Sequence, residues 1–403
     1  MSTDQSPAPP RLMSLDALRG FDMMWILGGD SLAYALNKTG SIGITRLIGE
    51  QLEHVQWAGF HFYDLIFPLF VFIVGVSLVF SLDRIIARHG RREALKRVFK
   101  RSVLLFLVAL IYSGGFTTLW PDIRLLGVLN RIALCYFFAS LIYCFVPLRG
   151  MIAICAGLLV GYWALMSFGS FPDTRPVNAA GELIDQRMTA TNVAQLNFTS
   201  TNRLRGVFEP GLNLANYVDS KYLPGKKWDK TWDPEGMLST LPAIASCLLG
   251  VFAGLFLKSP RTDERKKVAW LLTVGAAGVI AGFAWGVQFP VVKKIWTSSF
   301  VLVAGGYSAI LLGTFYWVID VLKLQSWCQP FVWIGMNPIT LYLTENIVGF
   351  RRVASRFLGG DVKAFFDSAI TPGFGDLMLS LGEIGLAFLL AWWLYRRKIF
   401  LRL

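Results

Sequence analysis

Long blocks of apolar residues recur along this chain of 403 residues. A helix needs about 20 such residues to cross the roughly 30 Å hydrocarbon core of a bilayer. We place spanning helices at residues 15–36, 62–83, 99–115, 124–147, 151–168, 238–257, 268–288, 298–322, 330–348 and 376–397. The sequence therefore predicts an all-α, polytopic membrane protein with about ten transmembrane helices.

Charged residues are scarce, at 16% of the chain against 54% hydrophobic residues. A soluble domain carries about 25% charged residues, so this chain has too few to cover a water-facing surface. The net charge is +13, but the basic residues lie in short loops between apolar blocks. This placement is the positive-inside pattern of membrane proteins, so we interpret the charge as topology and expect no nucleic-acid partner.

Three basic segments set the orientation: residues 84–101, 258–267 and 396–402. With ten helices all three lie on one side, which predicts that both termini are cytoplasmic. The segments 37–61 and 169–237 then face outward. A fourth basic segment, 351–363, also lies outside, where we expect its side chains to contact phosphate groups or to line a cavity.

Two other parts of the chain stand apart from the helices. Residues 1–14 form a polar, Pro-rich tail, and residues 15–403 form one transmembrane domain. Within it, residues 169–237 are polar and end in an aromatic stretch. Long loops of this kind tend to be functional, so we expect this one to form a lid over the outer face. The five cysteines have no framework spacing, and we interpret them as buried, inert thiols.

Charged side chains inside apolar blocks are costly unless they are paired or face water. Asp16 and Arg19 lie three residues apart on one helical face, Asp30 follows them, and Glu345 lies near the outer end of the ninth block. Structural ion pairs and functional groups are both consistent with these positions. Asp64 begins the second predicted helix, where an acid is also favoured as a helix cap.

Histidine is the sharper signal, because the chain has only three. His54 and His61 precede the second predicted helix on the outer side, beside Glu53 and Trp57. An imidazole titrates near neutrality and is a natural base for an attacking amine or hydroxyl. A catalytic histidine and a structural interfacial histidine both stay open on these grounds. We predict no metal, because the sequence has no tight cluster of His and Cys ligands.

Several stretches together resemble one family. They are LDALRGF at residues 15–21, HVQWAG at 54–59, DLIFPLFVFIVG at 64–75, GVLNRI at 127–132, DPEGMLST at 233–240, GVFAG at 250–254 and GMNPITLY at 335–342. They are similar to the transmembrane acyltransferases related to lysosomal heparan-α-glucosaminide N-acetyltransferase, in its bacterial branch. The resemblance extends over most of residues 12–400 and implies a bacterial inner-membrane enzyme.

The family transfers acetyl from cytoplasmic acetyl-CoA to the amine of a terminal glucosamine across the membrane. By this resemblance His54 is the catalytic histidine and Asp64 its neighbouring acid. The chain departs from the lysosomal sequences at Asp30, where they carry Asn, so Asp30 is a second candidate to orient or charge His54. The chain has no Gly-rich phosphate loop, so acetyl-CoA would have to bind in a membrane-embedded pocket.

The remaining candidates are assigned by role. We expect Arg124, Arg131 and Asn337 to bind the CoA phosphates or the oxyanion, and Trp57, Glu53 and Glu235 to bind the amino-sugar acceptor. His54 would deprotonate the amine directly, or would carry acetyl as an acetyl-histidine. Competing functions are a secondary transporter of an amino sugar and an O-acyltransferase acting on cell-envelope polysaccharide. The partners expected are acetyl-CoA, the acceptor and membrane lipid, and a homodimer is open by resemblance.

Overall fold

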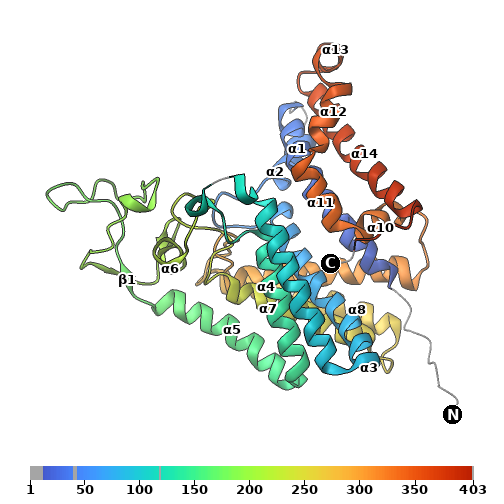
Figure 1. Ribbon diagram of the computed structural model, residues 1–403, viewed down its shortest axis with the longest axis horizontal. Helices are drawn as coiled ribbons and strands as arrows, with labels where there is room; N and C mark the ends of the chain where they lie inside the picture. Colours follow the sequence, from blue (N-terminus) through green and yellow to red (C-terminus); the bar gives the residue numbers. More distant parts are fainter. Residues whose placement is uncertain (1–11, 40–42, 118, 402–403) are drawn as a thin grey trace.

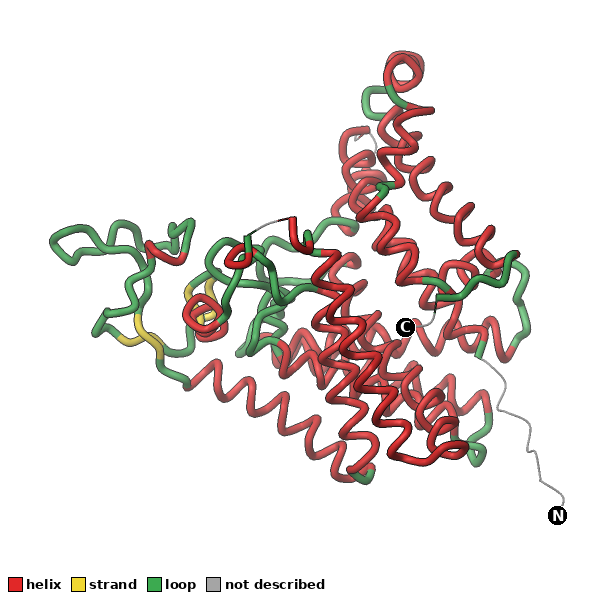
Figure 2. Tube along the Cα trace, viewed as in Figure 1, coloured by secondary structure: helices red, strands yellow, loops and turns green. Residues whose placement is uncertain are grey.

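The computed structural model describes residues 12–39, 43–117 and 119–401. The described chain is helical in most of its length, as Figures 1 and 2 show. Its long helices are α1 (Met13–Thr39), α3 (Phe62–Tyr112), α4 (Val128–Phe145), α5 (Leu148–Phe168), α7 (Thr240–Lys258), α8 (Glu264–Gly286), α9 (Ser298–Phe315) and α14 (Phe374–Arg396). The shorter ones are α2 (Gly43–Gln51), α6 (Leu214–Tyr222), α10 (Gln329–Met336), α11 (Pro338–Ile347), α12 (Phe350–Leu358) and α13 (Gly360–Ala369).

Seven helices of the described residues are long and apolar enough to cross a membrane. They are α3, α4, α5, α7, α8, α14 and the stretch Ser298–Val321, in which a π-helical turn extends α9. The prediction of an all-α, polytopic membrane protein is therefore confirmed. Residues 1–11 of the predicted N-terminal tail lie outside the described residues.

The seven helices are fewer than the ten predicted spans for three local reasons. Two predicted spans, 62–83 and 99–115, are both part of α3, which ends at Tyr112, three residues before the second span was expected to end. The span 15–36 falls within α1, whose acidic residues and Arg19 reduce its apolar character. The span 330–348 is divided into α10 and α11 at Asn337, where the backbone leaves the helical conformation before Pro338.

The long helix α3 is broken once, at Gly90. The φ angle of Gly90 is +80°, a conformation that residues with a Cβ atom rarely adopt. The chain reverses direction at this point, so the two halves of α3 form a hairpin (Figure 1). The basic segment 84–101 lies at this turn, at the opposite end of the first half of α3 from Asp64.

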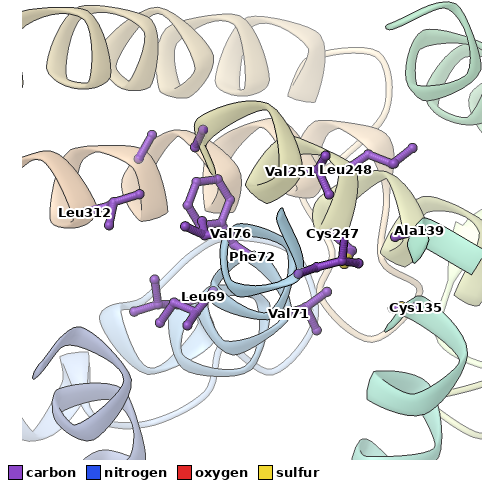
Figure 3. Close-up of a cluster of buried hydrophobic side chains, with 14 of the residues drawn as sticks. Leu69, Val71, Phe72, Val76, Cys135, Ala139, Cys247, Leu248, Val251 and Leu312 are labelled. Atoms are coloured by element: carbon purple, nitrogen blue, oxygen red, sulfur yellow. The ribbon is translucent and has the colours of Figure 1, made fainter. Parts of the chain in front are cut away.

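A core of apolar residues joins α3, α4, α7 and α9, as Figure 3 shows in close-up. Val76 and Phe72 of α3 lie there beside Cys247 and Val251 of α7. Small residues bring these two helices together: a Cβ atom on Gly75 would collide with the carbonyl oxygen of Cys247, and one on Gly250 with that of Phe72. Close packing at small residues is the usual basis of helix association in a membrane.

A second group of helices consists of α1 with α10 and α14, which pack against one another. Gly20 and Gly335 allow a close approach of α1 and α10, because a Cβ atom on either would collide with backbone of the other helix. The predicted lid, residues 169–237, is mostly loop and projects to one side (Figure 2). It contains α6 and two short antiparallel pairs, β1 (Phe171–Pro172) with β2 (Arg203–Leu204) and β3 (Phe208–Glu209) with β4 (Leu212–Asn213).

Candidate active site

A cavity of about 470 Å³ lies among α1, α3, α4 and α11 and the loops that precede α3, α7 and α9. One part of its lining is apolar and includes Met23 and Ile26, from the middle of α1, and Phe70, from the first half of α3. The polar part carries most of the predicted site residues. These are Asp30, His54, Trp57, Asp64, Arg124 and Glu235.

His54 and Asp64 form the centre of the polar part. The imidazole Nδ1 of His54 lies 2.8 Å from Oδ1 of Asp64. The other carboxylate oxygen of Asp64 accepts hydrogen bonds from the backbone amides of Val55, at 3.3 Å, and His61, at 3.1 Å. Asp64 therefore caps the start of α3 and holds His54 at the same time, so its structural and functional interpretations are both compatible with the geometry.

The pairing assigns the tautomer of His54. An ionised carboxylate can only accept a hydrogen bond, so Nδ1 carries the proton that it donates to Asp64. Nε2 then has a free lone pair. The side chain of Asp64 is 2% exposed and that of His54 is 49% exposed, so the acid is buried while the base can be reached from the cavity. The ring of Tyr63 packs against the imidazole, with ring centroids 4.7 Å apart.

A third charged group, Lys293, joins this pair from the loop between α8 and α9. Its Nζ lies 3.5 Å from Oδ1 of Asp64, and 3.2 Å and 3.4 Å from Nδ1 and Nε2 of His54. Burial lowers the pKa of the Lys293 ammonium, and the charges of Asp64 and Glu235 oppose this shift without cancelling it.

Lys293 is absent from the residues expected from the sequence. A signal was present: Lys293 and Lys294 stand between two apolar blocks at an end that the orientation places outside, where basic residues are unusual.

A second charged cluster ties the cavity to residues 169–237, which are called the outer segment after their predicted side of the membrane. Arg124 donates to both carboxylate oxygens of Asp233, at 2.8 Å and 2.7 Å, and to Glu235 at 2.7 Å. Its guanidinium also lies 5.0 Å from the ring centroid of Trp228. Burial raises the pKa of Glu235, and the nearby charges of Arg131 and Arg124 oppose that shift. Two of the three guanidinium nitrogens of Arg124, Nε and Nη2, are thus already engaged.

Trp57 lines the cavity and contacts the outer segment as well. Its indole Nε1 donates a 2.8 Å hydrogen bond to the carbonyl oxygen of Phe208 in β3. Its ring also meets that of Trp232 edge to face, with centroids 5.8 Å apart. The outer segment is therefore anchored directly beside His54.

Three candidate residues are not among the described residues that line the cavity. Arg131 is 1% exposed and donates to the backbone carbonyl groups of Pro234 and Gly236 and to Ser239. Asn337 bonds the backbone of Ile399 and Leu401 near the end of the chain. Glu53 is exposed and accepts from Asn37. All three side chains hold backbone or neighbouring segments in these positions.

Asp30 lines the cavity, but Asp64 occupies the position beside His54 Nδ1 that an orienting acid requires. The negative charge of Asp30 acts on Lys293 instead. It raises the pKa of Lys293 and so opposes part of the lowering caused by burial. Of the described residues, no three His, Cys, Asp or Glu side chains form a group that could hold a metal ion. The five cysteines are buried and unpaired with one another.

The fold and this cavity define a polytopic helical membrane protein with a histidine–carboxylate pair in a pocket that is lined in part by residues of the segment 169–237. Residues 11–196 match the family described as heparan-alpha-glucosaminide N-acetyltransferase, catalytic. This match includes His54, Asp64 and Arg124. It ends before Glu235 and Lys293.

Two curated proteins are similar to a larger part of the chain. Heparan-alpha-glucosaminide N-acetyltransferase of Homo sapiens is 25% identical over 402 residues, which covers 85% of this chain and 54% of the human protein. The protein of the same name from Mus musculus is 24% identical over 353 residues, which covers 73% of this chain and 49% of the mouse protein. The resemblance expected from the sequence is confirmed. The chain spans about half the length of the curated relatives that it matches.

Proposed function

We propose that this protein is a transmembrane acetyltransferase that moves the acetyl group of acetyl-CoA to the amine of glucosamine or of a terminal glucosaminide. The observation that carries the proposal is the 2.8 Å contact between His54 Nδ1 and Asp64 Oδ1 inside the cavity. Both curated relatives are named as N-acetyltransferases of a glucosaminide, which supports the same class of reaction.

Acetyl transfer needs an unprotonated amine next to a thioester. In the proposed reaction Nε2 of His54 takes a proton from the acceptor amine as its nitrogen attacks the acetyl carbonyl. Asp64 holds the imidazole in the required tautomer and stabilises the imidazolium that forms, as carboxylates do in catalytic triads. We propose direct transfer, in which Nε2 acts as the base. An acetyl-histidine route would use the same lone pair of Nε2 as a nucleophile, so the two routes are separated by experiment.

The two kinds of lining suit the two substrates. The apolar part beside Met23, Ile26 and Phe70 extends toward the membrane interior and suits the arm that carries the thioester. The polar mouth has Trp57 and Trp228, whose rings offer faces on which a sugar can stack, and Glu235, a hydrogen-bond partner for hydroxyl groups.

The positive-inside rule supports an orientation for the protein in the membrane. The basic turn at Gly90 lies at the end of the first half of α3 away from Asp64, so under this rule the His54 end faces outward. We propose a bacterial inner membrane, with both termini in the cytoplasm and residues 169–237 as a periplasmic lid. A homodimer and bound membrane lipid stay predictions.

The test is transfer of labelled acetyl from acetyl-CoA to glucosamine by purified protein in detergent. His54→Ala should abolish transfer while the protein keeps its melting temperature. His89→Ala is the matched control, because His89 is exposed in the basic turn of α3. The absence of transfer to any amino sugar, with no shift in melting temperature on adding acetyl-CoA, would overturn the proposal and favour an amino-sugar transporter.

A second experiment separates direct transfer from the covalent route. The protein is incubated with labelled acetyl-CoA and no acceptor, then denatured and counted. Direct transfer predicts no labelled protein and kinetics in which both substrates bind before any product leaves. Label that depends on His54, together with ping-pong kinetics, would establish the acetyl-histidine instead.

A further inference from the structure

Acetyl transfer places a negative charge on the carbonyl oxygen as the acceptor attacks, and preorganised donors aimed at that charge are commonly the largest catalytic contribution. The residues expected to supply such donors are only partly available. Arg124 gives its Nε and Nη2 to Asp233 and Glu235, and neither Arg131 nor Asn337 is among the residues described as lining the cavity. A partner that lies closer to His54 is therefore better placed to bind the developing oxyanion.

Lys293 is placed to be that partner. Its Nζ lies 3.2 Å from Nδ1 and 3.4 Å from Nε2 of His54. Because the two distances are nearly equal, the ammonium lies beside the imidazole rather than on the lone-pair axis of Nε2. The lone pair stays open to the acceptor, and a carbonyl attacked next to Nε2 comes within hydrogen-bond reach of the ammonium, at about 2.8 Å.

The charge of Lys293 is only partly neutralised by its surroundings. Its nearest acid, Asp64, is 3.5 Å away and is shared with His54 and with two backbone amides. The neighbouring Lys294 pairs with another acid, because its Nζ lies 3.1 Å from the carboxylate of Asp229. It also lies 5.7 Å from the ring centroid of Trp232.

We propose that Lys293 is a catalytic residue whose ammonium group binds the oxyanion formed during acyl transfer. This inference rests on the proposed function. The acceptor nitrogen forms a bond to the carbonyl carbon and gives its proton to Nε2, while the C=O electron pair moves to the oxygen beside Nζ. When the tetrahedral intermediate collapses, the C–S bond breaks, the C=O bond returns, and the CoA sulfur takes the proton from Nε2.

Because the pKa of Lys293 is lowered, its role can be tested by measuring how kcat depends on pH. An ordinary lysine loses its proton near pH 10.4, and a lowered pKa moves that loss to a lower pH. The charged form is the one that binds an oxyanion, so kcat should fall on the alkaline side below that value. Besides Asp64 and His54, the acids whose charges act on Lys293 in the cavity are Asp30 and Glu235, and Arg124, Lys294 and Tyr63 also line this cavity.

The experiment compares Lys293→Gln and Lys293→Arg with the wild type. Lys293→Gln should lower kcat by about 10²- to 10³-fold, as the loss of one oxyanion donor does, with a KM for each substrate within a few-fold of the wild type. Lys293→Arg keeps the charge, so it should recover much of kcat and move the alkaline fall to higher pH, because arginine stays protonated. Lys221→Gln, on α6 away from the cavity, is the matched control.

The outcomes separate the two proposals. If the wild type transfers no acetyl, the proposed function fails. If the wild type is active and folded Lys293→Gln keeps kcat within about three-fold, the Lys293 assignment is wrong and the His54 base stands. An alkaline fall that stays at the same pH in an active Lys293→Arg variant would also overturn it. Melting temperatures of all the variants show whether each is folded.

Discussion

The backbone amide of Gly59 donates a 2.9 Å hydrogen bond to the carbonyl oxygen of Val291. An antiparallel bridge between Ala58 and Val292 continues this contact. The two segments belong to the loops that precede α3 and α9, and one carries His54 while the other carries Lys293. The position of the ammonium relative to the imidazole therefore depends on backbone contacts between these loops.

Gly59→Ala should disturb this arrangement. The φ angle of Gly59 is +129°, and a Cβ atom there would lie 3.2 Å from Cγ1 of Val55. We expect a loss of about 1–3 kcal/mol in the free energy of unfolding, the usual cost of such a backbone conformation, and a lower kcat. Thermal melts and acetyl-transfer rates measure both.

The matched glycine control is Gly157→Ala in α5, where a Cβ atom meets nothing within 4 Å. Alanine favours a helix, so the melting temperature of this variant should be unchanged or higher. A Gly59→Ala protein with wild-type stability and rate would show that the contact between the two loops is not needed.

Asp64→Asn tests the charge of the buried acid. Asparagine has the same size and can still accept a backbone hydrogen bond, but it does not stabilise an imidazolium on His54. We expect kcat to fall by about 10²- to 10⁴-fold in a folded protein. Asp185→Asn, an exposed position in the outer segment, is the control. Equal rates for the two variants would argue against a charged partner for His54.

The stability of the outer segment should depend on pH through Asp219 in α6. Burial raises the pKa of Asp219 to about 7, although the backbone amide of Met237 bonds its carboxylate. The folded protein therefore holds this proton more tightly than the unfolded chain, whose Asp pKa is about 3.9. The contribution of Asp219 to the free energy of unfolding is therefore fully present below about pH 4, and it is lost as the pH rises toward 7.

Asp219→Asn removes the titrating proton and should make the melting temperature less dependent on pH between 5 and 8. Melts of the wild type and the variant at both pH values measure this, with Asp185→Asn as the control for an exposed acid. A wild type and an Asp219→Asn variant with the same pH dependence would contradict the prediction.

Arg124→Lys tests the cluster at the cavity mouth. Lysine keeps the charge but cannot donate to both oxygens of Asp233 and to Glu235 in the same planar geometry. Asp233 is 1% exposed, so its carboxylate would be left poorly satisfied, at a cost of about 1–3 kcal/mol. We expect a lower melting temperature and a higher KM for the acceptor.

Arg175→Lys is the comparison for that prediction. Arg175 makes a similar two-point contact with Asp173, at 2.9 Å and 2.6 Å, in the outer segment but not at the cavity. The Arg175→Lys variant should have a lower melting temperature and an unchanged KM for the acceptor. A KM that rises equally in both variants would mean that the outer segment as a whole, rather than the cluster at Arg124, controls acceptor binding.

The sequence was sufficient for the all-α, membrane-spanning class of the fold and for the pairing of His54 with Asp64. Apolar blocks identify membrane helices because satisfying the backbone in hydrocarbon depends on local composition and length. His54 and Asp64 are ten residues apart, on the same loop and helix start, so motif and proximity along the chain sufficed to place them together.

Other site residues depended on which way a helix faces and on contacts between distant segments. Arg131 and Asn337 lie in family-like motifs, yet their side chains point to backbone partners rather than to the cavity. The basic segment 351–363 was expected at phosphate groups or a cavity. Two of its side chains pair with acids of α14: Arg351 with Asp376 and Glu383, and Lys363 with Asp376.

Lys293 is the clearest example of a site residue that only the folded structure could identify. It is separated from His54 by 239 positions, and no pattern of spacing connects them. The packing of α9 against α3, and the backbone contact between Gly59 and Val291, bring the ammonium to the imidazole. Hydropathy is a local property that the sequence determines by itself, whereas the electrostatics of the site arise from distant segments that meet only in the folded protein.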